Sequence, residues 1–256
     1  MKRRIPMLSI HLKKVTIAVM SICLLSACGG IQQGQPDTNP QNTRDQTMQE
    51  EQPQRVRSYP ATDRRFTQTE FIMPILEEWY VYWGGTNVRD NYHYAYESQR
   101  YAYDLVIRKN GRSYSGDRRK NESYYAFGKE VIAPAGGEVI QVEQSIPDNE
   151  PVGRMNPSRP FGNYVMIDHG NQEYSVISHL KRNSPTVQVG DVVEQGQLIG
   201  LCGNSGNSSE PHIHFHVANS PVLNQGQSIR IRLKNNENPV RGQYVQPAGV
   251  ETPDTP

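Results

Sequence analysis

The chain has 256 residues and a formal net charge of +1 at pH 7. Nucleic-acid binding relies on a cationic surface, so this charge balance gives no electrostatic support for a nucleic-acid partner. Of the cysteines, Cys23 and Cys28 lie in the N-terminal region and Cys202 lies far downstream. A mature domain that retains Cys202 alone cannot form an internal disulfide.

The N-terminus has the pattern of an export signal. Basic residues precede an apolar run of eleven residues, Val15 to Leu25, which is too short to span the hydrocarbon core of a bilayer. The run ends in Leu25-Ser26-Ala27-Cys28, which resembles the cleavage box of bacterial lipoproteins. We therefore expect residues 1–27 to be a lipoprotein signal peptide and Cys28 to carry the lipid. The alternatives are an ordinary secretory signal with an incidental cysteine and a short transmembrane anchor.

Two segments of different character follow the signal. Residues 28–57, which begin with the lipidated cysteine, are rich in Gln, Pro, Asn and Asp and cannot bury enough apolar surface to fold. They predict a disordered linker with a typical span of about 30 Å. Residues 58–90 predict a segment that braces the next domain. Apolar residues between Glu70 and Trp83 recur at roughly helical spacing, but Pro74 interrupts them, so a short helix and a packed arm both remain open.

The rest of the chain predicts a mainly β fold, because short apolar runs alternate with turn residues and long helical periods are absent. Residues 145–161 contain four prolines and predict a long loop, and loops of this length are often functional. Beyond Asn235 the polar, proline-containing sequence predicts a loosely ordered end. The expected strands are 101–107, 131–133, 138–142, 163–168, 173–179, 198–201 and 212–217.

The most informative stretch is Pro211-His212-Ile213-His214-Phe215-His216-Val217. Its period-two alternation predicts a strand that directs Ile213, Phe215 and Val217 to the core. The three histidines would then share the opposite, open face. Imidazoles gathered on one face pack poorly but suit a metal ion. The whole chain has seven histidines, so three within five positions indicate a function.

Two motifs precede this strand. Residues 189–200 follow a GD-V-GQ-IG pattern, and residues 203–210 form a Gly/Asn/Ser-rich loop before the PH-x-HF strand. The three motifs together resemble the C-terminal half of the lysostaphin/LytM-type zinc peptidases, which cut peptide cross-links in bacterial cell walls. The resemblance extends over roughly residues 93–218. It implies an antiparallel β-sheet of the LytM-like barrel-sandwich hybrid type, with few short helices, over residues 91–240. The composition of residues 241–256 predicts a polar C-terminal tail.

The resemblance also implies roles for individual residues. A catalytic zinc typically takes three protein ligands and keeps a fourth position open. The second histidine of the PH-x-HF strand, His214, would be a ligand. His212 and the histidine of the Ser-His-Leu segment, His179, would be the two catalytic imidazoles. The remaining ligands would be a histidine and an aspartate upstream, here His93 and Asp104.

The spacing of the upstream ligands departs from the commonest family pattern. Ten residues separate His93 from Asp104, whereas three separate the two ligands in that pattern. Glu97 stands at the commoner spacing from His93 and is a rival acidic ligand. We favour Asp104 because it begins an apolar strand that can hold its carboxylate rigidly, whereas Glu97 lies in a polar connecting segment.

Other polar residues near these motifs carry separate expectations. His216 would share the strand face of His214 but lie one step farther from the metal, so we expect it to face solvent. The alternative is that it contacts a metal ligand from behind or contacts the substrate. His169 is expected in a turn, as a structural or exposed residue. Cys202 is expected to be a small core residue. Three loop residues either line a substrate groove or serve only loop geometry: Asn204, Ser205 and Asn207.

The sequence therefore predicts a lipid-anchored endopeptidase with a Zn²⁺ cofactor that hydrolyses peptide cross-links of peptidoglycan. The predicted location of this endopeptidase is the bacterial cell envelope, outside the cytoplasm. Its partners would be peptidoglycan peptides and the membrane. The alternative is a catalytically weak or inactive wall-binding regulator of another hydrolase. A biotinyl or lipoyl carrier is excluded, because such domains present a modified lysine in a turn and no lysine stands between Asp191 and Arg230.

Overall fold

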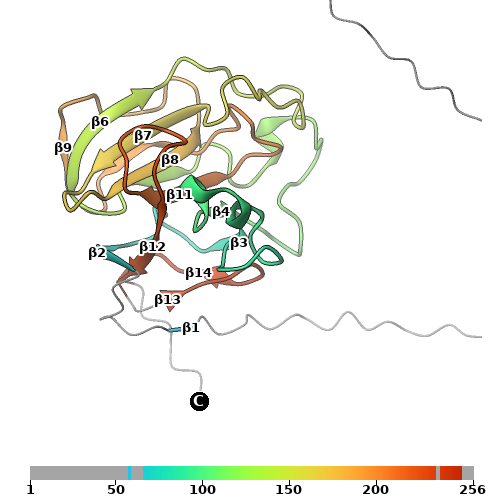
Figure 1. Cartoon of the computed structure of the whole chain (residues 1–256). Helices are drawn as coiled ribbons and strands as arrows, with labels where there is room; N and C mark the ends of the chain where they lie inside the picture. Colours follow the sequence, from blue (N-terminus) through green and yellow to red (C-terminus); the bar gives the residue numbers. More distant parts are fainter. Residues whose placement is uncertain (1–56, 59–65, 235–236, 250–256) are drawn as a thin grey trace, which may run out of the picture. The chain divides into compact units, whose positions relative to one another are not determined.

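The computed structural model describes residues 57–58, 66–234 and 237–249 (Figure 1). The predicted signal peptide, Cys28 and all but the last residue of the predicted linker lie outside these residues. Among the described residues, no helix is both long and apolar enough to cross a membrane.

Ten of the described strands belong to one sheet (Figure 1). Its main path has the order β14-β3-β4-β11-β8-β7-β6-β9, while β12 pairs with both β11 and β2. Every pair on the main path is antiparallel, and β2–β12 is parallel. Two further antiparallel pairs are β10–β5 and β1–β13. The bounds are β1 (Arg57–Ser58), β2 (Phe66–Phe71), β3 (Trp79–Trp83), β4 (Tyr103–Val106), β5 (Glu130–Ile132), β6 (Gly137–Glu143), β7 (Asn163–Asp168), β8 (Tyr174–Leu180), β9 (Val192–Val193), β10 (Leu198–Leu201), β11 (Ile213–Ala218), β12 (Ser228–Leu233), β13 (Glu237–Asn238) and β14 (Tyr244–Val245).

Helical structure in the described residues is limited to three short 3₁₀ segments. They are η1 (Tyr92–Ala95), η2 (Glu97–Gln99) and η3 (Asn121–Ser123). Residues 145–161 contain no helix or strand, as predicted. The expectation of a mainly β, antiparallel fold with few short helices is confirmed.

Strand β11 is buried on both faces. Ile213, Phe215 and Val217 are fully buried in the main core, as the alternation predicts. Side chains of this size each contribute about 1.5–3 kcal/mol when they leave water. His214 and His216 on the opposite face are also buried, each with 3% of its surface exposed. The prediction of an open histidine face is therefore wrong, because other parts of the chain cover it.

The segment between Glu70 and Trp83 is extended rather than helical. β2 ends at Phe71 and pairs with β12, and β3 pairs with β4 inside the main sheet. The helical alternative is therefore wrong, and the segment packs as strands whose Trp79 and Val81 lie in the core. The proposed domain boundary at residue 90 stays a prediction.

The C-terminal part is more ordered than its composition suggests. β13 pairs with β1, and β14 pairs with β3 at one end of the main path. Val245 of β14 is 1% exposed and belongs to the core. The expectation of loose order beyond Asn235 is therefore wrong for residues 237–249.

Candidate metal centre

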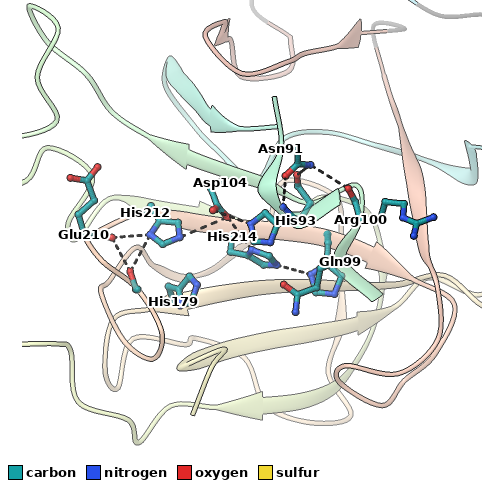
Figure 2. Close-up of polar contacts among 12 residues, drawn as sticks. Asn91, His93, Gln99, Arg100, Asp104, His179, Glu210, His212 and His214 are labelled. Carbon is teal, nitrogen blue, oxygen red and sulfur yellow. Dashed lines mark hydrogen bonds and ion pairs between the residues drawn. The ribbon is translucent and has the colours of Figure 1, made fainter. Parts of the chain in front are cut away.

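His93 is held in place by a buried asparagine two residues before it. The Asn91 carboxamide oxygen accepts a hydrogen bond from the His93 backbone N–H at 3.1 Å, and its nitrogen donates to the carbonyls of Gly85, Arg100 and Ala102 (Figure 2). This cap starts η1, which carries His93. The imidazole is 3% exposed.

Asp104 and His214 meet because β4 and β11 are neighbours. In the β4–β11 register His214 lies directly opposite Asp104, and residues paired in this way project to the same face of a sheet. His214 Nδ1 lies 3.0 Å from Asp104 Oδ1, and His93 Nε2 lies 3.0 Å from Asp104 Oδ2 (Figure 2).

The three side chains form a buried cluster with the composition of a zinc site. One donor atom from each of His93, Asp104 and His214 lies within 4.8 Å of the others. Tetrahedral zinc with bonds of about 2.0–2.2 Å separates donor atoms by roughly 3.3–3.6 Å, so small movements of these side chains would suffice. Glu97, the rival ligand, is exposed in η2 and accepts a hydrogen bond from Gln227, outside the cluster.

The charges of the cluster also suit a cation. Burial would raise the pKa of Asp104, but the neighbouring His93 and His212 and hydrogen bonds from His214 and His93 outweigh it, so this pKa lies well below its ordinary value. Burial lowers the pKa of His214 to about 4. At neutral pH the cluster therefore presents one carboxylate and a neutral His214. A buried carboxylate needs a positive partner, which a metal ion would supply.

Two more imidazoles flank this cluster, and each has its Nδ1 facing a backbone carbonyl. His179 Nδ1 lies 2.8 Å from the Ser205 carbonyl oxygen, and His212 Nδ1 lies 2.8 Å from that of Glu210. Because a carbonyl can only accept, both Nδ1 atoms carry the proton and both Nε2 atoms keep a free lone pair in the neutral rings. His212 Nε2 lies 3.8 Å from Asp104 Oδ1, at the cluster.

The two flanking rings lie side by side, with centroids 4.6 Å apart. Burial, helped by the nearby His212 and His214, lowers the pKa of His179 well below its ordinary value. His179 also has a left-handed backbone, with φ of +64°, at the end of β8. Non-glycine residues adopt this conformation at a cost and often do so at functional sites.

The loop of residues 203–210 sets the position of His179 and is itself braced from the long loop. Asn149 donates from its carboxamide to the carbonyls of Gly206 and Ser208, and Asn204 donates to Asn121. Asn204 and Ser205 are fully buried, so they serve the loop rather than line a groove. Asn207 differs from them, because it lines both cavities described below.

Residues 123–231 match the sequence pattern of peptidase family M23. This part of the chain is a peptidase M23 domain. His179, His212 and His214 lie inside the matched stretch, whereas His93 and Asp104 precede it. This match confirms the predicted resemblance to lysostaphin/LytM-type peptidases for residues 123–231.

Relatives of the M23 domain include a metalloprotease of Haemophilus influenzae of uncharacterised function, 36% identical over 92 residues, which are 35% of this chain and 16% of the relative. The peptidoglycan DD-endopeptidase ShyC of Vibrio cholerae is 32% identical over 104 residues, 41% of this chain and 22% of ShyC. The chain thus spans less than a quarter of either relative. The lysostaphin catalytic domain from Staphylococcus simulans is similar with a TM-score of 0.36 and 21% identity, over 60% of this chain and 88% of that one.

Two cavities open beside the cluster of His93, Asp104 and His214. One, of about 250 Å³, is lined by His93, His179 and His214, and the other, of about 280 Å³, by Asp104 and His212. Tyr92 and Asn207 line both. The cluster therefore contributes residues to both cavities, which is an arrangement suited to an extended ligand that crosses the cluster.

The sequence reading missed Tyr92. Its ring centroid lies 4.0 Å from that of His93, and 45% of the side chain is exposed. Partial burial of its hydroxyl and the charge of Asp104 raise the pKa of Tyr92, so the phenol stays protonated and able to donate. Its position directly before the candidate ligand His93 was the sequence feature that could have indicated a place beside the site.

Three other residues can now be placed. The expectation that His216 faces solvent is wrong, because it is 3% exposed and lies 2.9 Å from His214 through Nδ1. His169 is structural, with its ring nitrogens at 2.7 Å from the Gly136 carbonyl and from the Ser175 hydroxyl. Cys202 is a fully buried core residue, and burial raises the pKa of its thiol well above the ordinary value.

Proposed function

We propose that this protein is a zinc-dependent endopeptidase that hydrolyses peptide cross-links of bacterial peptidoglycan. The observation that carries the proposal is the buried cluster of His93, Asp104 and His214, flanked by two imidazoles with free Nε2 atoms. The named activity of the relative ShyC supports the choice of substrate.

The ligands of the zinc ion would be His93, Asp104 and His214. When bound, zinc supplies a Lewis acid that polarises the scissile carbonyl and favours deprotonation of water. The protein supplies the rigid, largely water-excluded surroundings. Asn91 holds the loop of His93, and the paired strands β4 and β11 hold the other two ligands.

His179 and His212 would move protons and stabilise developing charge. Each ring is oriented through Nδ1 by a backbone carbonyl, so Nε2 is directed to the site in a defined tautomer. A neutral ring of this kind accepts a proton from the attacking water, and after protonation it donates to an oxyanion or to the leaving amine.

The two cavities support an extended substrate. A peptide laid across the cluster would place residues on either side of the scissile bond in one cavity each, between Tyr92 and Asn207. The Tyr92 hydroxyl and the Asn207 carboxamide can hydrogen-bond to peptide groups of the substrate.

We further propose that the protein acts in the cell envelope from a lipid anchor at Cys28. The support is the sequence alone: a basic start, a short apolar run and the Leu25-Ser26-Ala27-Cys28 box. The polar linker that follows would let the catalytic domain search peptidoglycan within about 30 Å of the membrane, and farther when stretched.

The test is mass spectrometry of peptidoglycan fragments after incubation with the purified chain, in three arms: zinc-loaded, chelated, and chelated with zinc restored. We expect cross-linked dimers to become monomers in the first and third arms only. Fragments from the zinc-loaded arm that retain every cross-link would contradict the proposal. Binding to the wall without cleavage in that arm would favour the regulatory alternative.

A further inference from the structure

The second histidine of β11, His216, contacts the ligand histidine His214 on the side away from the cluster. His214 Nε2 lies 2.9 Å from His216 Nδ1. On its other side, His214 Nδ1 faces Asp104 at 3.0 Å (Figure 2). Both rings are 3% exposed. The 2.9 Å contact lies within the range of a hydrogen bond between ring nitrogens.

The protons on these nitrogens follow from the role of His214, and this step rests on the proposed function. A neutral imidazole that binds a metal through Nδ1 carries its only proton on Nε2. That N–H points at His216 Nδ1, which must then be the acceptor. The proton of neutral His216 is therefore on its own Nε2.

The surroundings leave His216 little freedom to move. Its backbone pairs with Val176 of β8, while the backbone of His214 pairs with both Ser178 and Asp104. The ring of Phe161, from the end of the long loop, lies with its centroid 6.1 Å from that of His216 and 6.3 Å from that of His214. The two imidazoles are thus held as a packed pair.

We propose that His216 is a positioning residue, which accepts the Nε2–H of His214 and so sets the tautomer and ring orientation of the metal ligand. It is not one of the three residues of the cluster and it lines neither of the two cavities, so it acts through His214. Partners of this kind orient metal-binding histidines, and their loss typically weakens metal affinity or activity about 10–100-fold. An imidazole acceptor is neutral, so it orients the ligand without adding a charge to the site.

The first test compares two substitutions of equal size in the purified chain. His216→Asn keeps an acceptor near the place of Nδ1, whereas His216→Leu removes it, and both lose the ring contact with Phe161. Competition with a chromophoric chelator measures zinc affinity. We expect the Leu variant to bind zinc about 10–100-fold more weakly than wild type, and the Asn variant to recover most of that loss. Urea unfolding of the zinc-free chains checks that both variants fold.

Equal zinc affinity of folded Leu and Asn variants would overturn the inference while leaving the proposed function intact. A wild-type chain that binds no zinc and cleaves no cross-link would overturn both.

The second test uses the unaltered protein, so it does not depend on whether the variants fold. Long-range ¹⁵N–¹H correlation spectra of the zinc-loaded chain report which ring nitrogen of each histidine carries the proton. We expect the proton on Nε2 of both His214 and His216. A His216 protonated on Nδ1 could not accept from His214, and this result would overturn the inference.

Discussion

Asp104 shows how a carboxylate in a protein core can indicate a metal. It is 5% exposed, and its ion-pair contacts are with the imidazoles of His93, His212 and His214. Taking a carboxylate out of water costs several kcal/mol unless a positive charge close by compensates it. A divalent ion at this position would remove the imbalance.

We therefore expect Asp104→Asn to lose zinc, while Glu97→Gln, the matched change at the rival position, retains it. The zinc affinity should fall by more than the roughly 10–100-fold that is typical when a residue hydrogen-bonded to a ligand is lost, because here a direct ligand is removed. Zinc content after dialysis and chelator competition measure the difference. Loss of zinc from the Glu97 variant alone would make Glu97 the acidic ligand.

His212 presents a different ring atom to the cluster from His214. Its Nδ1 faces the Glu210 carbonyl, and its Nε2 stops 3.8 Å from Asp104. This geometry favours proton transfer beside the metal over coordination.

We expect His212→Ala to keep about one zinc per chain while its turnover falls about 10²–10⁴-fold, the range for loss of a general acid–base group. His169→Ala, in the turn between β7 and β8, is the control and should keep both zinc and turnover. Elemental analysis and the cross-link assay give the two readouts. Should zinc leave with His212, the roles of His212 and His214 are reversed.

At the scale of elements, the C-terminal strand completes the sheet that carries the site. β14 pairs with β3, β3 with β4, and β4 holds Asp104. Val245 opposes Trp79 and is 1% exposed, whereas Ala248 a few residues later is exposed.

Val245→Asp should destabilise the protein by about 3 kcal/mol or more, because it buries a charge without a partner. Ala248→Asp adds the same charge at an exposed position and should change the free energy of unfolding by less than about 0.5 kcal/mol. Urea denaturation compares the two. Equal stability of both variants would show that β14 contributes nothing to the fold.

Across the whole molecule, the proposed lipid anchor at Cys28 and the M23 domain occupy separate parts of the sequence. The apolar run before Cys28 is short, and the linker after it is polar. A single lipid chain binds membranes only marginally, whereas two chains on one cysteine give stable attachment.

Cys28→Ala should therefore move the protein from the membrane to the soluble fraction, without a change in the catalytic domain. Fractionation followed by immunoblotting measures the shift, and the cross-link assay on the released protein serves as the control. Continued membrane association of the Cys28 variant would indicate an uncleaved signal anchor.

Features that depend on local pattern could be predicted from the amino-acid sequence. The alternation in residues 212–217 identified β11 and its three core residues, because side chains of a strand project to opposite faces in turn. The apolar run after Asp104 likewise pointed to β4. The candidate ligands could be named in advance, because their residue types and motifs are visible in the chain.

Which of these residues meet, and which strand faces are covered, depends on long-range contacts in the folded chain. Asp104 lies opposite His214 through the β4–β11 register, and pairing between strands 110 residues apart leaves no local pattern. His216 is buried because Phe161, from a proline-rich loop, packs beside it. The polar C-terminal segment is ordered because β14 pairs with β3. Burial on the second face of a strand and order in a polar segment depend on what packs there, and long-range contacts alone supply that.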